Sequence, residues 1–173
     1  RLYRNPLYLE VEEIPEFEEY RVAGLRIEAP GGEATLAALR QSERIDYAGV
    51  MAAKYSVLKR LHNYFITQHR DRGTARDLAY SEYLAYEGDS LEQFATFLAL
   101  ADHFSMRDPA HFDWHSWPTE YHSPNSEEVI RFRQEHSEAI DFHRWVQFEL
   151  DRQLAEISQD ARVRELSIGI YSD

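Results

Sequence analysis

Residues 105–125 are the part of the chain richest in groups that could do chemistry. His111 and His115 are four positions apart, a spacing that places two imidazoles on one helix face and suits zinc. A third ligand could come from one of three nearby side chains, namely His103, Asp113 or His122. The Trp117-Pro118 pair interrupts any helix here and favours a loop. We therefore expect no metal site and no cofactor.

Two tryptophans lie in the same segment. Trp114 and Trp117 could form a stacking platform for sugar rings, because an aromatic face presents apolar area that matches the C–H face of a sugar. Alternatively, both indoles pack in the core, since exposing them would waste roughly a few kcal/mol at about 25 cal/mol per Å². The segment is therefore predicted to be a packed loop, with Trp114 and Trp117 as candidates for substrate contact.

Carboxylates are abundant, but their spacing does not mark a catalytic pair. Adjacent acids occur at Glu12-Glu13, Glu18-Glu19 and Glu127-Glu128. Neighbouring side chains diverge on a helix or a strand, so these pairs predict solvated surfaces. Asp173 differs because it comes two positions after the apolar run Ser167–Tyr171, where a buried strand would present a functional side chain. On the residues alone, it can equally be a polar residue at a strand end.

Composition restricts the class of partner. The 173 residues, 43% of them apolar, suffice for one compact domain with a sizeable core. A formal net charge of -12 argues against nucleic acid and anionic membranes, which need a basic face. The absence of cysteine excludes disulfides and thiolate metal sites and is compatible with the cytoplasm. No apolar run approaches the roughly 20 residues of a membrane span.

The first third of the chain combines a strand pattern with helix patterns. Apolar residues alternate with polar ones over Leu7–Val11, which predicts a strand closed by Ile14-Pro15. Pro30-Gly31-Gly32 predicts a turn before a short helix at residues 33–40. From about residue 47 to residue 69, apolar side chains recur at spacings of three and four, which predicts an amphipathic helix.

Capping signals divide the rest of the chain. Thr74 with Asp77 predicts the start of a helix running to Tyr86, before Gly88 interrupts the pattern. Ser90 and Gln93 form a capping-box pattern for the next helix. A helical pattern from Ser126 to Arg164 is longer than usual, and Ser137 can cap a new helix, so we expect a break near His136. The last helix then leads into a second strand, Ile168–Tyr171.

Four blocks occur in order along the chain: Arg1–Phe17, Arg44–Leu58, Phe142–Leu154 and Ser167–Asp173. Together they resemble the amylomaltase type of 4-α-glucanotransferase, in glycoside hydrolase family 77. Between the second and third blocks, Phe94–Phe104 and Asp113–Pro118 resemble the helical insertion of that family. Each block is short, and the specificity of the resemblance lies in their order and their coverage of nearly the whole chain.

The resemblance implies a parent enzyme with a (β/α)8 TIM barrel. The expected fold class is mainly α: residues 1–15 would form the second barrel strand and its exit, 16–136 a helical insertion, and 137–173 a helix leading into the third strand. Leu7–Val11 and Ile168–Tyr171 would then be adjacent parallel strands. Two strands without their barrel would expose unpaired edges, so we also expect that the isolated segment could self-associate.

The resemblance also implies retaining glycosyl transfer, which uses two carboxyl groups about 5 Å apart as nucleophile and acid/base. Both would lie on later strands, so no residue of this chain is assigned a catalytic role. The family's Asp at the tip of the third strand matches Asp173, which implies a supporting role in binding the donor sugar. Trp114 and Trp117 are further substrate-binding candidates.

Two functions remain open. The first is a part of a cytoplasmic 4-α-glucanotransferase that moves α-1,4-glucan segments between maltooligosaccharides. In this case the segment shapes the substrate cleft and is inactive alone. The second is a free-standing acidic helical module that binds a protein partner without catalysis. The chain starts at Arg1 in place of Met and stops two residues after its last apolar run, so we expect an internal piece of a larger protein, which favours the first function.

Overall fold

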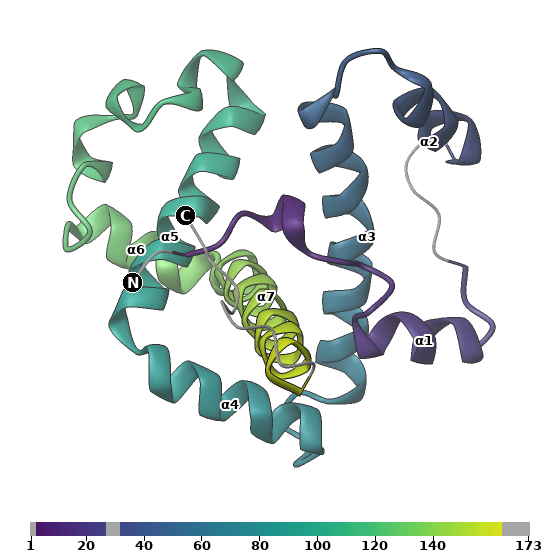
Figure 1. Ribbon diagram of the computed structural model, residues 1–173. Helices are drawn as coiled ribbons and strands as arrows, with labels where there is room; N and C mark the ends of the chain where they lie inside the picture. Colours follow the sequence, from purple (N-terminus) through teal and green to yellow (C-terminus); the bar gives the residue numbers. More distant parts are fainter. Residues whose placement is uncertain (1–2, 27–31, 164–173) are drawn as a thin grey trace. The chain divides into compact units, whose positions relative to one another are not determined.

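The computed structural model describes residues 3–26 and 32–163, and every regular element within them is helical (Figure 1). The α-helices are α1 (Pro15–Val22), α2 (Gly32–Gln41), α3 (Tyr47–Gln68), α4 (Ala75–Glu87), α5 (Asp89–Arg107), α6 (Glu127–Glu135) and α7 (Ser137–Val163). Short 3-10 helices are η1 (Pro6–Tyr8), η2 (Pro109–Phe112), η3 (Trp114–Ser116) and η4 (Thr119–Tyr121). In the described ranges, no helix has the length and apolar character needed to cross a membrane.

The chain divides into two compact units. The first comprises Arg1–Asp77 together with Val146–Asp173, and the second comprises Leu78–Trp145. Helices α4 and α7 therefore each contribute residues to both units. The first unit is discontinuous in sequence, whereas the second is one continuous stretch.

Helix α3 forms the centre of the core of the first unit. Asp46 caps it by accepting a hydrogen bond from the backbone N–H of Gly49 at 2.9 Å. Its buried face carries Leu58, Leu61 and Phe65, as the apolar period predicts. The helices predicted at residues 33–40 and 47–69 are thus confirmed as α2 and α3.

The second unit packs around α5, α6 and the first turns of α7. Its core cluster contains Ala95, Ala99, Leu100, Phe104, Trp117, Val129, Phe132 and Ile140. Between α5 and α6 the chain passes through a loop that contains η2, η3 and η4 (Figure 1). Trp117 of this loop packs in the core cluster. The packing predicted for this loop is confirmed for Trp117 but not for Trp114, which is exposed.

Several predicted helix boundaries are confirmed. Thr74 Oγ1 accepts a hydrogen bond from the N–H of Asp77 at 3.2 Å, at the start of α4. Ser126 caps α6 through the N–H of Val129 at 3.3 Å. Helix α6 ends before His136, which separates it from α7 at the expected break.

The capping box predicted at Ser90 and Gln93 is wrong. Only Gly88 separates α4 from α5, which begins at Asp89. Gly88 has a φ of 58°, a left-handed conformation that glycine adopts without a Cβ clash. This single residue turns the chain, so Ser90 lies inside the first turn of α5 and does not cap it.

Helix α1 was not predicted from the sequence. Pro15 is its first residue, and Glu16 and Glu18 lie in its first turn. Proline at the first helical position and acids near the positive end of the helix dipole both favour a helix start. The Ile14-Pro15 pair, which was predicted to close a strand, therefore begins a helix.

The first predicted strand, Leu7–Val11, is also wrong. These residues form part of η1 followed by irregular backbone. Their burial does alternate, since Leu9 is buried while Tyr8 and Glu10 are exposed. The alternation therefore reports correctly which side chains face the core, but not how the backbone hydrogen bonds are made.

Side chains of α3 and α7 satisfy the backbone of the N-terminal segment, residues 3–14. The amide of Gln147 binds both the N–H and the C=O of Arg4, at 3.0 and 2.8 Å. The amide of Gln153 binds the N–H and the C=O of Glu10 in the same way, at 2.9 and 2.7 Å. The Lys54 ammonium donates to the C=O groups of Leu7 and Leu9, at 2.7 and 2.9 Å. These bonds take the place of a neighbouring strand.

The expected fold class is therefore corrected to mainly α without the N-terminal barrel strand. The second predicted strand, Ile168–Tyr171, lies outside the described residues, and so does its expected pairing with the first. Self-association through strand edges stays a prediction, although the described part of the chain contains no strand to provide such an edge.

Replacing Gln147 by Met should destabilise the protein, because the side chain keeps its length but loses both hydrogen bonds to Arg4. Gln147 is 2% exposed, so the orphaned backbone groups cannot be fully rehydrated, and we expect a loss of about 1–3 kcal/mol in the free energy of unfolding. Urea unfolding followed by circular dichroism measures this loss. Gln134→Met, at an exposed position of α6, is the matched control, and equal midpoints for the two variants would contradict the prediction.

Candidate functional site

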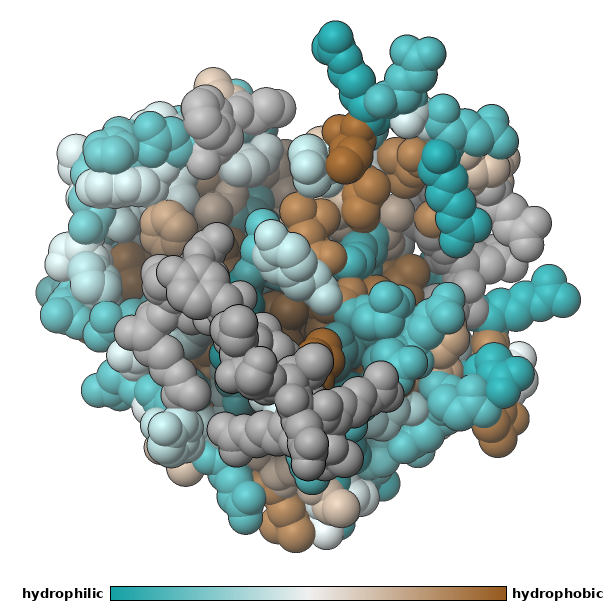
Figure 2. Space-filling model, viewed as in Figure 1, coloured by the Kyte–Doolittle hydropathy of each residue, from teal (hydrophilic) through white to brown (hydrophobic). Residues whose placement is uncertain are grey.

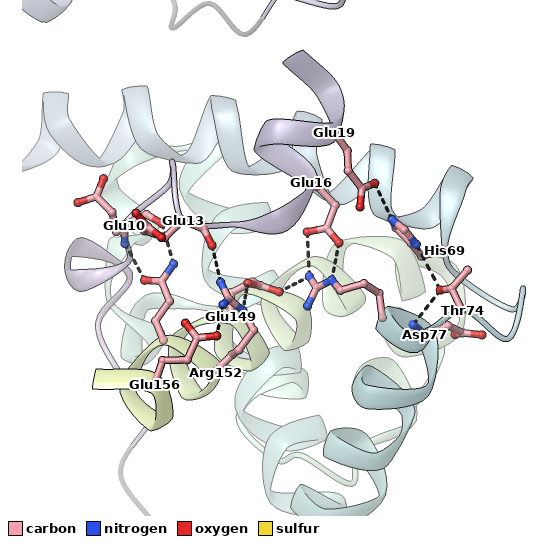
Figure 3. Close-up of polar contacts among 12 residues, drawn as sticks. Glu10, Glu13, Glu16, Glu19, His69, Thr74, Asp77, Glu149, Arg152 and Glu156 are labelled. Atoms are coloured by element: carbon pink, nitrogen blue, oxygen red, sulfur yellow. Dashed lines mark hydrogen bonds and ion pairs between the residues drawn. The ribbon is translucent and has the colours of Figure 1, made fainter. Parts of the chain in front are cut away.

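Two carboxylates of the first unit are fully buried, which makes them candidates for unusual chemistry. Glu16 of α1 and Glu149 of α7 are both 0% exposed, and both accept hydrogen bonds from Arg76 of α4 (Figure 3). The contact with Glu16 is bidentate, with Nε–Oε1 and Nη2–Oε2 distances of 2.7 and 2.8 Å. The guanidinium carbon also lies 5.7 and 5.0 Å from the ring centroids of Phe65 and Phe148. One cation therefore links three helices.

Arg152 extends this ion network along α7. Its Nε donates to Glu149 at 2.9 Å and its Nη1 to Glu156 at 2.7 Å. Its Nη2 donates to the backbone C=O of Glu13 at 2.6 Å, which ties α7 to the N-terminal segment (Figure 3). The two buried negative charges of Glu16 and Glu149 thus face the two positive charges of Arg76 and Arg152.

The electrostatics of this network favour a structural role. Burial raises the pKa of Glu149, although the guanidinium groups of Arg76 and Arg152 act in the opposite direction. Burial alone would lower the pKa of Arg76, but its bonds to Glu16 and Glu149 outweigh that effect and raise it. The Arg76 guanidinium therefore stays charged. Burial instead disfavours the ionised form of Glu149. A catalytic carboxyl group must also reach a substrate, which two fully buried side chains cannot do.

An open cavity of ≈ 400 Å³ lies in the first unit among residues 10–12, α1, α2 and α3. Its lining consists of Val11, Phe17, Leu36, Leu39, Val50, Ala53 and Val57 with four charged residues, Glu10, Glu12, Arg40 and Lys54. Apolar side chains reach the surface over α2 and α3 (Figure 2). Burial lowers the pKa of Lys54, against the influence of Glu10. Since two carbonyls already hold the Lys54 ammonium, the cavity offers mainly apolar surface.

The loop between α5 and α6 is shaped by aspartates that begin its short helices. Asp108 accepts a hydrogen bond from the N–H of Ala110 at 2.9 Å, at the start of η2. Asp113 accepts from the N–H of His115 at 3.2 Å, at the start of η3. Each carboxylate satisfies a donor that a helix start leaves unpaired, which fixes the loop without regular secondary structure.

The two tryptophans of this loop differ in exposure. Trp117 is 4% exposed. The centroid of its ring lies 5.3 and 5.4 Å from the ring centroids of Phe97 and Phe104. Its indole N–H donates to the C=O of His111 at 3.1 Å. Trp114 is 39% exposed. Of the two predicted substrate contacts, therefore, only Trp114 offers a ring to an external ligand, and Trp117 packs in the core.

His111 and His115, the pair weighed as zinc ligands, each lie beside an aspartate. His111 Nδ1 is 3.6 Å from Asp108 Oδ2, and His115 Nδ1 is 2.8 Å from Asp113 Oδ1. Within the described ranges, no group of three or more histidine, aspartate or glutamate side chains is arranged to hold a metal ion. The geometry of the loop therefore gives no support to the zinc alternative that the spacing of these histidines offered.

Asp173, the other predicted substrate-binding residue, lies outside the described residues. The buried ion network, in contrast, was not predicted. One signal was present, because Glu149 follows Trp145 by four positions on the buried face of α7, where an acid requires a partner. Its partners Arg76 and Glu16 are 73 and 133 positions away in the sequence and share no pattern with it.

Comparison with known proteins places the chain among enzymes of one kind. The profile of glycoside hydrolase family 77, described as 4-alpha-glucanotransferase, matches residues 1–173. A 4-alpha-glucanotransferase of Mycobacterium tuberculosis (strain ATCC 25618 / H37Rv) is 36% identical over 177 residues, covering 100% of this chain and 22% of the relative. One from Haemophilus influenzae is 27% identical over 178 residues, covering 100% of this chain and 25% of the relative. The chain thus spans about a quarter or less of the length of these relatives.

Replacing Arg76 by Met should strongly destabilise the protein, because it leaves the buried charges of Glu16 and Glu149 without their shared cation. Removing one partner of a buried ion pair typically costs about 3–5 kcal/mol, and thermal and urea unfolding measure the loss. The matched control is Arg21→Met, which breaks an exposed pair with Glu18 and should have little effect. An Arg76 variant as stable as the Arg21 variant would show that the network does not hold the unit together.

Proposed function

The chain belongs to the 4-alpha-glucanotransferase family, glycoside hydrolase family 77, and on that premise we propose that it works as part of a longer enzyme. That enzyme transfers α-1,4-glucan segments between maltooligosaccharides. One observation carries the proposal: a single family profile matches residues 1–173, and the relatives align with all of the chain over a fraction of their own length. This match favours the enzyme over the free-standing binding module that the sequence left open.

The chemistry of the transfer requires groups that we do not assign to this chain. Retention through a covalent intermediate needs a carboxylate nucleophile and a carboxylic acid/base about 5 Å apart, both in contact with the sugar. Glu16 and Glu149, the two fully buried carboxylates, are held by guanidinium groups and have no exposed surface. We therefore propose that the catalytic pair lies in the rest of the enzyme and that this chain is inactive alone.

The contribution of this chain is to bind and orient the glucan. Trp114 supports this role, since the residue is 39% exposed and lies on a loop with hydrogen bonds at both ends of η3. An exposed indole can stack on the apolar face of a glucose ring. We also keep Asp173 as a proposed supporting residue at the donor sugar, because a carboxylate accepts hydrogen bonds from sugar hydroxyls. The cysteine-free composition is compatible with a cytoplasmic location, which remains part of the proposal.

Replacing Trp114 by Ala in the full-length enzyme should raise KM for maltooligosaccharides by about 2- to 12-fold, the equivalent of roughly 0.5–1.5 kcal/mol for one aromatic contact. The value of kcat should change little, because the ring binds substrate and transition state alike. A disproportionation assay with maltotriose, reading released glucose, gives both constants.

The matched control is Tyr8→Ala, which removes an aromatic ring that is 84% exposed in the first unit. It should leave KM unchanged. Wild-type kinetics in the Trp114 variant would show that Trp114 does not contact the glucan. A full-length protein that disproportionates no maltooligosaccharide would refute the proposed activity itself.

A further inference from the structure

The cavity of the first unit is an apolar recess beside the contact between α2 and α3. Helix α2 approaches α3 at Gly49, where an added Cβ would lie 2.8 Å from Leu39 Cδ2. Leu39 also lines the cavity of ≈ 400 Å³, which we call the α2–α3 recess. The larger apolar side chains of its lining are all only half-buried, namely Val11, Phe17, Leu36, Leu39, Val50 and Val57. The described residues therefore leave part of this apolar surface in contact with water.

The apolar surface continues from the recess to the start of α3. Tyr47 lies three positions before Val50 and so on the same face of this helix. Its side chain is largely exposed. Figure 2 shows the apolar side chains that reach the surface over α2 and α3. Contiguous exposed apolar surface with a polar border is typical of an interaction site.

Two of the four charged residues at the recess are already engaged. Lys54 Nζ donates to the carbonyl groups of Leu7 and Leu9, and the charge of Glu10 acts on this ammonium. Arg40 of α2 and Glu12 of the N-terminal segment are exposed, and within the described ranges neither has an ion-pair partner. The border of the recess thus offers one positive and one negative charge to an incoming partner.

We propose that the α2–α3 recess binds an amphipathic helix from the part of the parent enzyme outside residues 1–173. This inference rests on the proposed function. The relatives align with this chain over only about a quarter or less of their own length, so most of each relative lies outside the match. A helix in the same polypeptide reaches an effective concentration on the order of millimolar, and a modest apolar contact then suffices for docking.

The walls of the recess determine the kind of occupant. Apart from their ends, α2 and α3 bond their backbone groups internally, and Gln153 binds both backbone groups of Glu10. The walls therefore offer no row of backbone donors and acceptors, as a sheet edge would. An occupant must satisfy its own backbone, which a helix does while it inserts apolar side chains at spacings of three and four. An acid facing Arg40 and a base facing Glu12 would complement the border.

A small molecule fits the recess less well than a helix does. The volume lies within the range of roughly 300–1,000 Å³ that ligand sites have, but such sites also aim a few polar groups at the ligand. The Lys54 ammonium is held by two carbonyls. Arg40 and Glu12 are exposed to water at the border. The polar groups are therefore placed for a partner that extends beyond the recess.

The first test measures how often the recess is open in the full-length enzyme. Leu36→Cys introduces a thiol into a segment that has no cysteine of its own. Its labelling by N-ethylmaleimide is quantified on the peptide that contains residue 36, relative to the same thiol in denatured protein. A docked helix should slow this labelling at least about 10-fold compared with Ile157→Cys. Ile157 is an exposed residue of α7 in the same unit and does not line the recess.

Charge variants in the Leu36→Cys protein test the border. Arg40→Glu should raise the labelling rate by about 1.5- to 5-fold, the equivalent of one exposed ion pair. Arg40→Lys should leave the rate unchanged, because it keeps the charge. Arg131→Glu, at an exposed position of α6 in the second unit, is the matched control and should also leave the rate unchanged. Equal rates for Arg40→Glu and Arg131→Glu would contradict the proposed acid opposite Arg40.

The photo-cross-linking variant Leu36→p-benzoyl-phenylalanine identifies the occupant in the full-length enzyme. We expect a cross-link, within one molecule, to a peptide outside residues 1–173 whose apolar residues recur at helical spacing. A cross-link between two copies, visible as a doubled mass on a denaturing gel, would make the recess a self-association surface and overturn the proposal. Slow thiol labelling without any protein cross-link would indicate a bound small molecule instead. Labelling of Leu36→Cys at the rate of Ile157→Cys would show an open recess.

A disproportionation assay on the same proteins separates this proposal from the proposed function. An active enzyme without the intramolecular cross-link would refute the docking and leave the transferase activity intact. A cross-linked enzyme that disproportionates no maltooligosaccharide would refute the activity and leave the docking intact.

Discussion

The first unit depends on one buried cation. Arg76 binds Glu16 of α1 and Glu149 of α7 while its guanidinium lies against the rings of Phe65 and Phe148. Taking three charges out of water is expensive, and their mutual attraction offsets this cost only when every donor and acceptor is well placed. The arrangement therefore specifies how α1, α4 and α7 meet in the first unit, since a shift of any one of them would leave a buried charge unpaired.

The N-terminal segment follows the same rule, with two side-chain amides and one ammonium. The side-chain amides of Gln147 and Gln153 each hydrogen-bond both the N–H and the C=O of a single residue. The Lys54 ammonium donates to two more carbonyls. This explains why the strand prediction failed. An alternation of apolar and polar residues indicates which side chains are buried, and an irregular segment bonded to helix side chains produces it as well as a strand does.

Helices were predictable where their signals are local. The apolar period of α3 and the caps at Thr74 and Ser126 are readable from neighbouring residues, whereas the failed cap at Ser90 depended on the left-handed turn of Gly88. The candidate site was predictable only in part. Trp114 and Trp117 look equivalent in sequence, and the one-turn helix between them decides that one is exposed and one is buried.

The discontinuity of the first unit has a consequence for synthesis on the ribosome. Residues 78–145 form a unit from one continuous stretch, which can fold as soon as it emerges. Arg76, in contrast, is made 73 residues before Glu149, and Arg4 is made 143 residues before Gln147. At roughly 5–20 residues per second, the N-terminal segment waits on the order of ten seconds for the side chains that complete its hydrogen bonds. During that interval its apolar residues and unpaired backbone are open to other chains, so the nascent protein needs protection before the folded one is complete.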